Sequence, residues 1–122
     1  MHEDAAIRSL GALAHPHRLR AFRLLLRAHP EGCAAGEIAA ALRIPPSSLS
    51  FHLASLHAAG LVGSKRDRRR VVYRADLGGM RRLMRYLTRD CCDGNPEICA
   101  DLFVFAKGDA AVATTATEGG RK

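Results

Sequence analysis

The stretch PPSSLSFHLASLHAAG, residues 45–60, predicts a helix with well-defined ends. Pro46 suits the first helical position, because the N–H that proline lacks would have no partner there. Gly60 suits the residue after the helix, which often adopts a left-handed conformation. At about 100° per residue the helix has one apolar face, formed by Leu49, Leu53 and Leu56. We therefore expect this helix to pack through its leucines.

The opposite face of this helix is small and uncharged, which is unusual in a chain whose net charge is +7. Its members are Ser47, Phe51, Ala54 and Ala58, flanked by Ser48 and Ser55. Small polar side chains near a helix N-terminus fit the major groove of DNA, where a phenylalanine can contact a thymine methyl group. The alternative is that Phe51 packs beneath a neighbouring element of the same chain.

The next residues, LVGSKRDRRRVVYRAD (61–76), change from helical to strand character. Leu61, Val62 and residues 71–73 are strand formers, and the charged run KRDRRR (65–70) between them predicts a turn. By itself this run is equally typical of a solvated loop. Because the run follows a helix with an uncharged outer face, it favours a basic hairpin that contacts the sugar–phosphate backbone of DNA.

Four other segments predict helices. They are residues 4–14, 15–28, 34–44 and 77–92, and the second carries an apolar stripe of Leu19, Phe22 and Leu26. The resulting order is a short helix, a turn, a helix with an uncharged outer face and a basic hairpin, which is the order of a winged helix-turn-helix. We expect a mainly α fold with a β-hairpin. The predicted DNA contacts are Ser47, Ser48, Ser50, Phe51, His52, Ser55, Lys65, Arg66, Arg68, Arg69 and Arg70.

His52 has an alternative role, because it lies at the edge of the leucine stripe and fits a structural hydrogen bond. One such domain covers little DNA, which favours a homodimer on two half-sites of double-stranded operator DNA. The basic net charge and a pI near 9.9 agree with an anionic partner. The opening MHEDAAIRSL does not resemble a secretory signal, and no stretch is apolar for long enough to span a membrane. We therefore expect a cytoplasmic protein without membrane contact.

The run from Pro45 to Asp76 resembles the recognition helix and wing of the ArsR/SmtB metalloregulatory repressors, and LAHPHRLRAFRLL resembles the second helix of that family. The resemblance covers residues 4–92. It implies a homodimer, paired through the first and last helices, that binds its operator when metal-free and releases it when a metal or metalloid binds. In that light the predicted dimer interface comprises Ile7, Leu10, Leu77, Met80, Met84 and Leu87.

Two ion sites used within that family lack their ligands in this chain. Ala34, Gly36 and Ala39 stand where one site needs thiols, and Cys33 is offset by one residue, so we interpret Cys33 as idle. The zinc site on the last helix needs Asp and His, but that helix carries Arg81, Arg82, Arg85 and Arg89. The remaining candidate is RDCCDGNPEICA, residues 89–100.

This last stretch places Cys91 and Cys92 at a predicted helix end and returns Cys99 through the turn formers DGNP. Three thiolates without a carboxylate or imidazole make a soft site. The family's arsenite-responsive members carry similar C-terminal cysteines, and with ligand softness this resemblance implies arsenic(III) or antimony(III) as effector, with no organic cofactor. The alternatives are a disulfide, a zinc, cadmium or lead site with a fourth ligand, a site of Cys91 and Cys92 alone for methylated arsenicals, and a response to redox state.

An enzyme is not expected. The cysteine-to-arginine spacing of a thiol phosphatase-like arsenate reductase follows none of the four cysteines. The predicted organisation is a DNA-binding and dimerisation domain in residues 1–92, a cysteine-containing ligand segment in residues 89–106, and a disordered tail in residues 107–122. The predicted function is a repressor that dissociates from DNA when the metalloid binds Cys91, Cys92 and Cys99.

Overall fold

The computed structural model describes the backbone of residues 1–94 and the side chains of residues 1–89. The chain divides into two compact units, Met1–Met84 and Arg85–Lys122, and each is considered by itself. Cys99, most of the predicted ligand segment and the whole predicted tail lie outside the described residues. None of the helices in the described part is both long and apolar enough to cross a bilayer.

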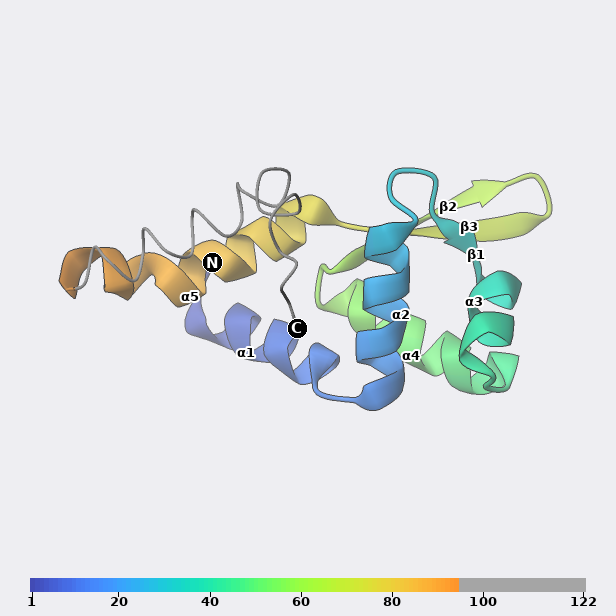
Figure 1. The fold of residues 1–122 in the computed structure, drawn as a ribbon, viewed down its shortest axis with the longest axis horizontal. Coiled ribbons are helices and arrows are strands. Elements are labelled where there is room, and N and C mark those ends of the chain that lie inside the picture. The colour runs from blue at the N-terminus through green and yellow to red at the C-terminus, as the bar shows by residue number, and fades with distance from the viewer. Residues whose placement is uncertain (95–122) are drawn as a thin grey trace, which may run out of the picture. The chain divides into compact units, whose positions relative to one another are not determined.

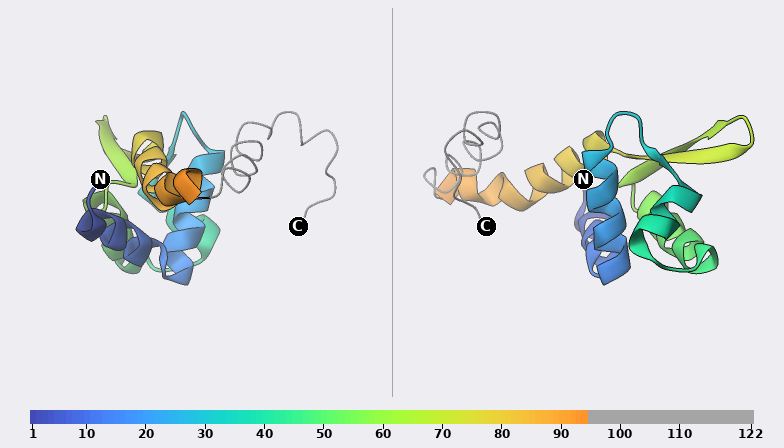
Figure 2. Two further views of the ribbon diagram at one scale, coloured as in Figure 1. Left: turned by 90° about the vertical axis from the view of Figure 1, so that its left-hand side faces the viewer. Right: turned by 45° about the vertical axis from the view of Figure 1, so that its right-hand side comes forward.

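The predicted order of elements is confirmed in the described residues (Figure 1). The elements are α1 (Glu3–Leu13), α2 (Pro16–Arg27), β1 (Cys33–Ala34), α3 (Ala35–Leu42), α4 (Pro46–Ala58), β2 (Val62–Asp67), β3 (Arg70–Ala75) and α5 (Leu77–Gly94). Helices α3 and α4 form the helix-turn-helix pair, and β2 and β3 form the hairpin that follows it in the sequence. The right-hand view of Figure 2 shows this hairpin extending beyond the helices. The fold is a winged helix-turn-helix.

The core forms where α4 packs against α2 and α3. The predicted stripe of Leu49, Leu53 and Leu56 is confirmed, since all three side chains are fully buried. The stripe predicted on α2 was partly wrong: Leu19 is 44% exposed, while Leu25 is fully buried. Helix α2 is in contact with α1, α3, α4 and β3, and spacing alone could not show which of its leucines these neighbours cover.

The sheet has three antiparallel strands in the order β1-β3-β2. The charged run 65–70 was predicted to be a turn, and this was wrong for most of it. Lys65 pairs with Val72, Arg66 with Val71 and Asp67 with Arg70, so the strands continue almost to the tip. Backbone pairing along a hairpin does not depend on apolar side chains, and an exposed hairpin tolerates charge on both faces. The two-residue strand β1, which pairs through Cys33 and Ala34, was not predicted.

Gly60 ends α4 as predicted, with a φ of 78°. The amide of Leu61 donates to the carbonyl of Leu56 at 3.1 Å, and the amide of Gly60 donates to that of His57 at 3.0 Å. These two bonds form a Schellman motif. Leu61 and Leu56 are both fully buried, which adds the apolar contact that usually accompanies the motif. This turn fixes where the recognition helix stops and the hairpin begins.

Helix α5 begins after Asp76, whose carboxylate accepts the amide of Gly79 at 3.0 Å. The residues of the predicted dimer-interface stripe on this helix differ in exposure. Leu77 and Met80 are half-buried and pack against the core of their own chain. Met84 is 46% exposed and Leu87 is 49% exposed. The start of α5 therefore packs against the core, and the role of these four residues in a dimer stays a prediction.

Candidate nucleic-acid interface

The outer face of α4 is exposed where the sequence predicted DNA contacts. Ser47, Ser48 and Ser50 lie at the start of the helix and are exposed. Pro45 precedes the helix and supplies no side-chain cap. The first-turn amides therefore face outward without a capping group, which is the arrangement that favours a phosphate at a helix N-terminus.

Phe51 extends this face and is 67% exposed. Its nearest described ring is that of His52, with centroids 5.9 Å apart. The alternative that Phe51 packs beneath another element of its own chain is therefore wrong for the described residues. A large apolar side chain exposed to water is available for contact with a partner. This exposure fits a side chain that meets the apolar part of a base.

His52 does not belong to this face, and its predicted DNA contact is corrected. Its side chain is only 8% exposed, whereas that of Phe51 beside it is 67% exposed. Its ring Nδ1 lies 3.5 Å from Nη1 of Arg18. The structural alternative, a histidine held by hydrogen bonding, describes it better. Ser55 is half-buried, so the exposed predicted contacts on α4 are the three serines near its start and Phe51.

The hairpin carries the basic part of the surface. Lys65, Arg66 and the residues 68–70 are all exposed. Arg68 has a φ of 62°, a conformation that favours glycine. Residues 68 and 69 form the turn itself. The tip therefore presents consecutive arginines in a tight turn, which is a compact source of phosphate contacts.

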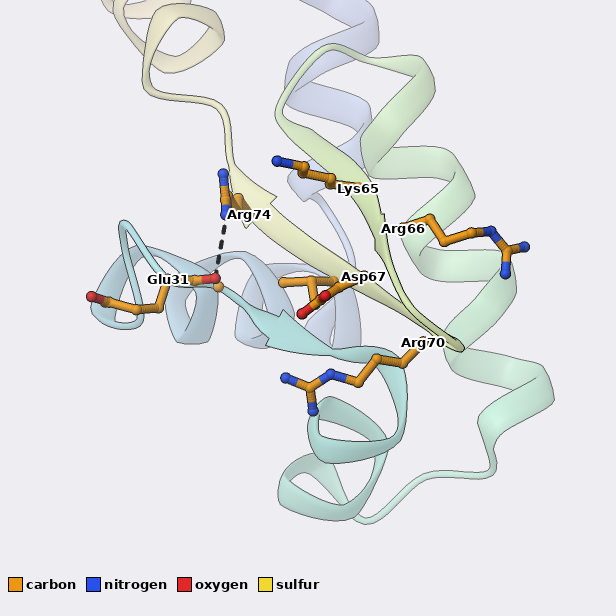
Figure 3. A pocket seen from close by; sticks show the side chains of 8 residues that line it. Glu31, Lys65, Arg66, Asp67, Arg70 and Arg74 are labelled. Atoms are coloured by element: carbon orange, nitrogen blue, oxygen red, sulfur yellow. Dashed lines mark hydrogen bonds between the residues drawn. The ribbon is translucent and has the colours of Figure 1, made fainter.

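One side of the hairpin lines a shallow pocket beside the loop that precedes β1 (Figure 3). Lys65, Arg70 and Arg74 face it together with Glu31 and Asp67. Nε of Arg74 donates to the backbone carbonyl of Glu31 at 3.5 Å. Basic side chains outnumber acidic ones here, so Arg74 joins the positive surface of the wing. Arg74 was not predicted from the sequence, because it lies within the apolar strand signal rather than in the charged run.

A second depression runs between α4 and the hairpin. It is lined by Ser50, Ala54 and His57 from the helix and by Ser64 and Tyr73 from the strands. His57 is exposed and lies one turn beyond Ala54 on the outer side of α4. Neither His57 nor Ser64 was predicted as a contact. The pairing of Ser64 with Tyr73 places Ser64 beside the helix, and only the sheet register could show this.

Cys33 lies in β1 and is half-buried. Burial, reinforced by the charge of Glu37, raises the pKa of its thiol above the usual value. The thiol is therefore protonated at neutral pH, and a protonated thiol is a poor nucleophile and a poor ligand. These properties agree with an idle cysteine.

The predicted three-cysteine site is only partly within the described residues. Cys91 and Cys92 lie in the last turns of α5, which extends to Gly94 rather than ending at residue 92. The structure describes their backbone but not their side chains. Cys99 lies outside the described residues, so the thiolate site stays a prediction.

Comparison with known proteins supports the architecture. A family model described as a helix-turn-helix domain matches residues 13–63. The crystal structure of a possible transcriptional regulatory protein (fragment 1–100) from Mycobacterium bovis is 31% identical, with 74% of this chain and 92% of that chain covered and a TM-score of 0.57. No curated protein matches the chain.

Two further solved structures describe the kind of protein involved. The solution structure of the homodimeric winged helix-turn-helix DNA-binding domain (fragment 1–100) of Mb0332 from Mycobacterium bovis, a possible ArsR-family transcriptional regulator, is 28% identical over 77% of this chain and 83% of that chain, with a TM-score of 0.59. A possible transcriptional regulator for arsenical resistance is 30% identical over 76% of this chain and 94% of that chain, with a TM-score of 0.59. With the exposed α4 face and the basic wing, these likenesses place the chain in the ArsR family of DNA-binding, winged helix-turn-helix transcription regulators.

Proposed function

We propose that this protein is a homodimeric repressor that releases operator DNA when arsenic(III) or antimony(III) binds Cys91, Cys92 and Cys99. The supporting observation is the length of α5, which continues through both adjacent cysteines before it ends at Gly94. The backbone of both cysteines thus lies in the last turn of this helix. Thiolate is the protein ligand that soft ions prefer. The likeness to a possible regulator for arsenical resistance adds support.

The proposed dimer would bury apolar side chains that are now in water. On α1, Ile7 is 58% exposed and Leu10 is 43% exposed, while Ala6 and Ser9 take the inner positions of that helix. On α5, Met84 and Leu87 are about half exposed. Burying such side chains against a second copy contributes roughly 25 cal/mol for each Å² of apolar surface removed from water. The homodimeric relative from Mycobacterium bovis uses the same fold.

The start of α5 offers a route from the effector to the DNA-binding helix. Gly79 lies directly against the backbone carbonyl of Gly60, the residue that ends α4. A displacement of α5 on ligand binding would therefore be passed to the end of α4 without a flexible side chain between them. Two recognition helices must keep a fixed spacing to meet both half-sites at once. A change in that spacing is the proposed cause of release.

The test uses a DNA duplex that the protein itself selects from a random library. Fluorescence anisotropy of the complex is followed during titration with arsenite or antimonite. We expect dissociation at micromolar metalloid for the native protein and none for the Cys91→Ser and Cys92→Ser variants. Cys33→Ser is the matched control, because its thiol is protonated and distant in sequence, and it should respond like the native protein. DNA affinity that is unchanged by both metalloids would contradict the proposal.

The number of sulfur ligands separates the proposed site from its alternatives. Arsenic X-ray absorption on the native protein should give three sulfur neighbours, and on Cys99→Ser two. Two sulfurs in both would indicate a site of Cys91 and Cys92 alone. Release by cadmium, lead or zinc but not by arsenite would replace the proposed effector with one of those ions. Release by peroxide alone, reversed by a thiol reductant, would replace it with redox sensing.

A further inference from the structure

Three histidines from two different helices meet beside the recognition helix. His15 is the N-cap residue of α2, His17 lies in the first turn of α2, and His52 comes from α4. One ring nitrogen from each lies within 4.8 Å of the others. The ring centroids of His15 and His52 are 4.4 Å apart, and that of His17 is about 5.5 Å from both. No part of the DNA-binding surface described above uses this cluster.

The spacing is close to what a metal ion needs. A tetrahedral ion that binds nitrogen at about 2.0–2.1 Å holds its ligand atoms roughly 3.4 Å apart. The three ring nitrogens lie within 4.8 Å of one another, so the rings would have to draw closer together to hold an ion. His15 and His17 are half-buried and His52 is buried, so the cluster is open to solvent on one side. Water can therefore complete the coordination from that side, as it does in zinc sites with three protein ligands.

The chemical state of the cluster also suits a metal. Burial lowers the pKa of His52 below its usual value, and the neighbouring His15 and Arg18 lower it further. Partial burial, with Arg18 and His17 nearby, lowers the pKa of His15 in the same direction. Both shifts favour the neutral imidazole, which is the form that binds metal ions.

Neighbouring groups orient the rings and also compete with an ion. Nδ1 of His15 accepts the backbone amide of His17 at 3.1 Å. Nε of Arg18 donates to the carbonyl of Ala12 at 2.8 Å, which holds the guanidinium beside His52. A bound cation would be repelled by this positive charge. The affinity should therefore be lower than that of a site supported by carboxylates.

We propose that His15, His17 and His52 form a binding site for a divalent transition-metal ion of the zinc, cobalt or nickel class. Imidazole ligands suit these ions. The ion would join the start of α2 to α4 at the residue next to Phe51, so its binding bears on the helix that faces DNA. The site uses no cysteine and is separate from the metalloid site proposed above.

The test is a cobalt(II) titration of a protein in which all four cysteines are replaced by serine. Without thiols, visible absorption bands must come from nitrogen and oxygen ligands. We expect one equivalent of Co²⁺ to give these bands and to shift the imidazole nitrogen signals of His15, His17 and His52 in NMR spectra. Zinc should displace the cobalt. Absence of the bands and of the shifts at millimolar cobalt would overturn the proposal.

Matched variants connect the binding to these residues. His15→Asn keeps an N-cap acceptor for the amide of His17 while it removes the imidazole. We expect this variant and His17→Gln to bind cobalt at least about tenfold more weakly, since even the loss of a group that only hydrogen-bonds to a ligand costs this much. His57→Asn changes an exposed histidine of α4 outside the cluster and should bind like its parent. Equal affinities in all three variants, with unchanged circular dichroism, would contradict the proposal.

The metal test and the test of the proposed function have separate readouts. Cobalt binding is measured without DNA and without cysteine. Metalloid-driven release is measured on the native protein in the absence of divalent transition metals. Failure of one therefore leaves the other intact.

Discussion

Gly79 of α5 lies against the backbone carbonyl of Gly60, the residue that ends α4, with no room between them for a side chain. A Cβ added to Gly79 would come 3.0 Å from the carbonyl carbon of Gly60 and closer still to its oxygen. Both partners are backbone, so neither can move aside by changing a rotamer. This contact joins α5, which carries the adjacent cysteines, to α4, which is predicted to face DNA.

Gly79→Ala is therefore expected to destabilise the fold by about 1–3 kcal/mol, the usual cost of overpacking a close contact. Gly78→Ala is the matched control, because a Cβ there would meet only side-chain atoms, at 3.2 Å from Asp76 and 3.4 Å from Arg82. Alanine is also the better helix former, which offsets this crowding. Urea denaturation of both variants measures the difference. Equal stabilities would show that the contact is not a tight one.

The proposed dimer makes Ile7→Glu a disruptive change. A charge in the centre of an apolar interface has no partner and would be desolvated, so the variant should sediment as a monomer at concentrations where the native protein is a dimer. Leu19→Glu is the control, because Leu19 is 44% exposed on α2 and lies outside the predicted interface. Sedimentation velocity distinguishes the two variants. Loss of the dimer in both, or in neither, would contradict the assignment of α1.

The basic wing predicts a specific salt dependence. Replacing Arg69, which lies in the exposed turn, by Gln should weaken DNA binding on all sequences alike. The slope of log K against log salt should become shallower by about 0.9 if Arg69 makes one phosphate contact. Arg81→Gln removes an equal charge from the exposed surface of α5 and should leave this slope nearly unchanged. Identical slopes for both variants would mean that only the net charge matters.

Mild acid is expected to lower the stability of the fold. Because the pKa values of His15 and His52 are lowered from 6.5 in the folded protein, the unfolded chain binds more protons as the pH falls. Stability is therefore complete above pH 6.5 and declines as the pH falls from 6.5 towards the folded pKa values. Thermal melting between neutral pH and pH 5 measures the decline. The His15→Asn variant should show a smaller decline in stability. A steeper decline in that variant would contradict the assignment of this decline to histidine protonation.

The sequence alone determined the helices, their order and the composition of the exposed α4 face that is predicted to contact DNA. Proline at the start of α4 and glycine after its end are local signals, because they depend on backbone chemistry at one residue. The leucine stripe of α4 was also predictable, since one face of a regular helix is set by its period. The exposed serines and Phe51 followed as the remaining face of the same helix.

Only the tertiary structure decided which contacts connect distant segments. The burial of His52, its meeting with His15 and His17, and the contact between Gly60 and Gly79 depend on how α2, α4 and α5 pack, and no local pattern contains that information. The same holds for the extent of the strands, because the charged residues 65–67 pair through their backbone with residues 70–72. The pattern of apolar and polar side chains predicts which face of a helix or strand is buried. Which element packs against that face is decided only when the helices and strands assemble into the core.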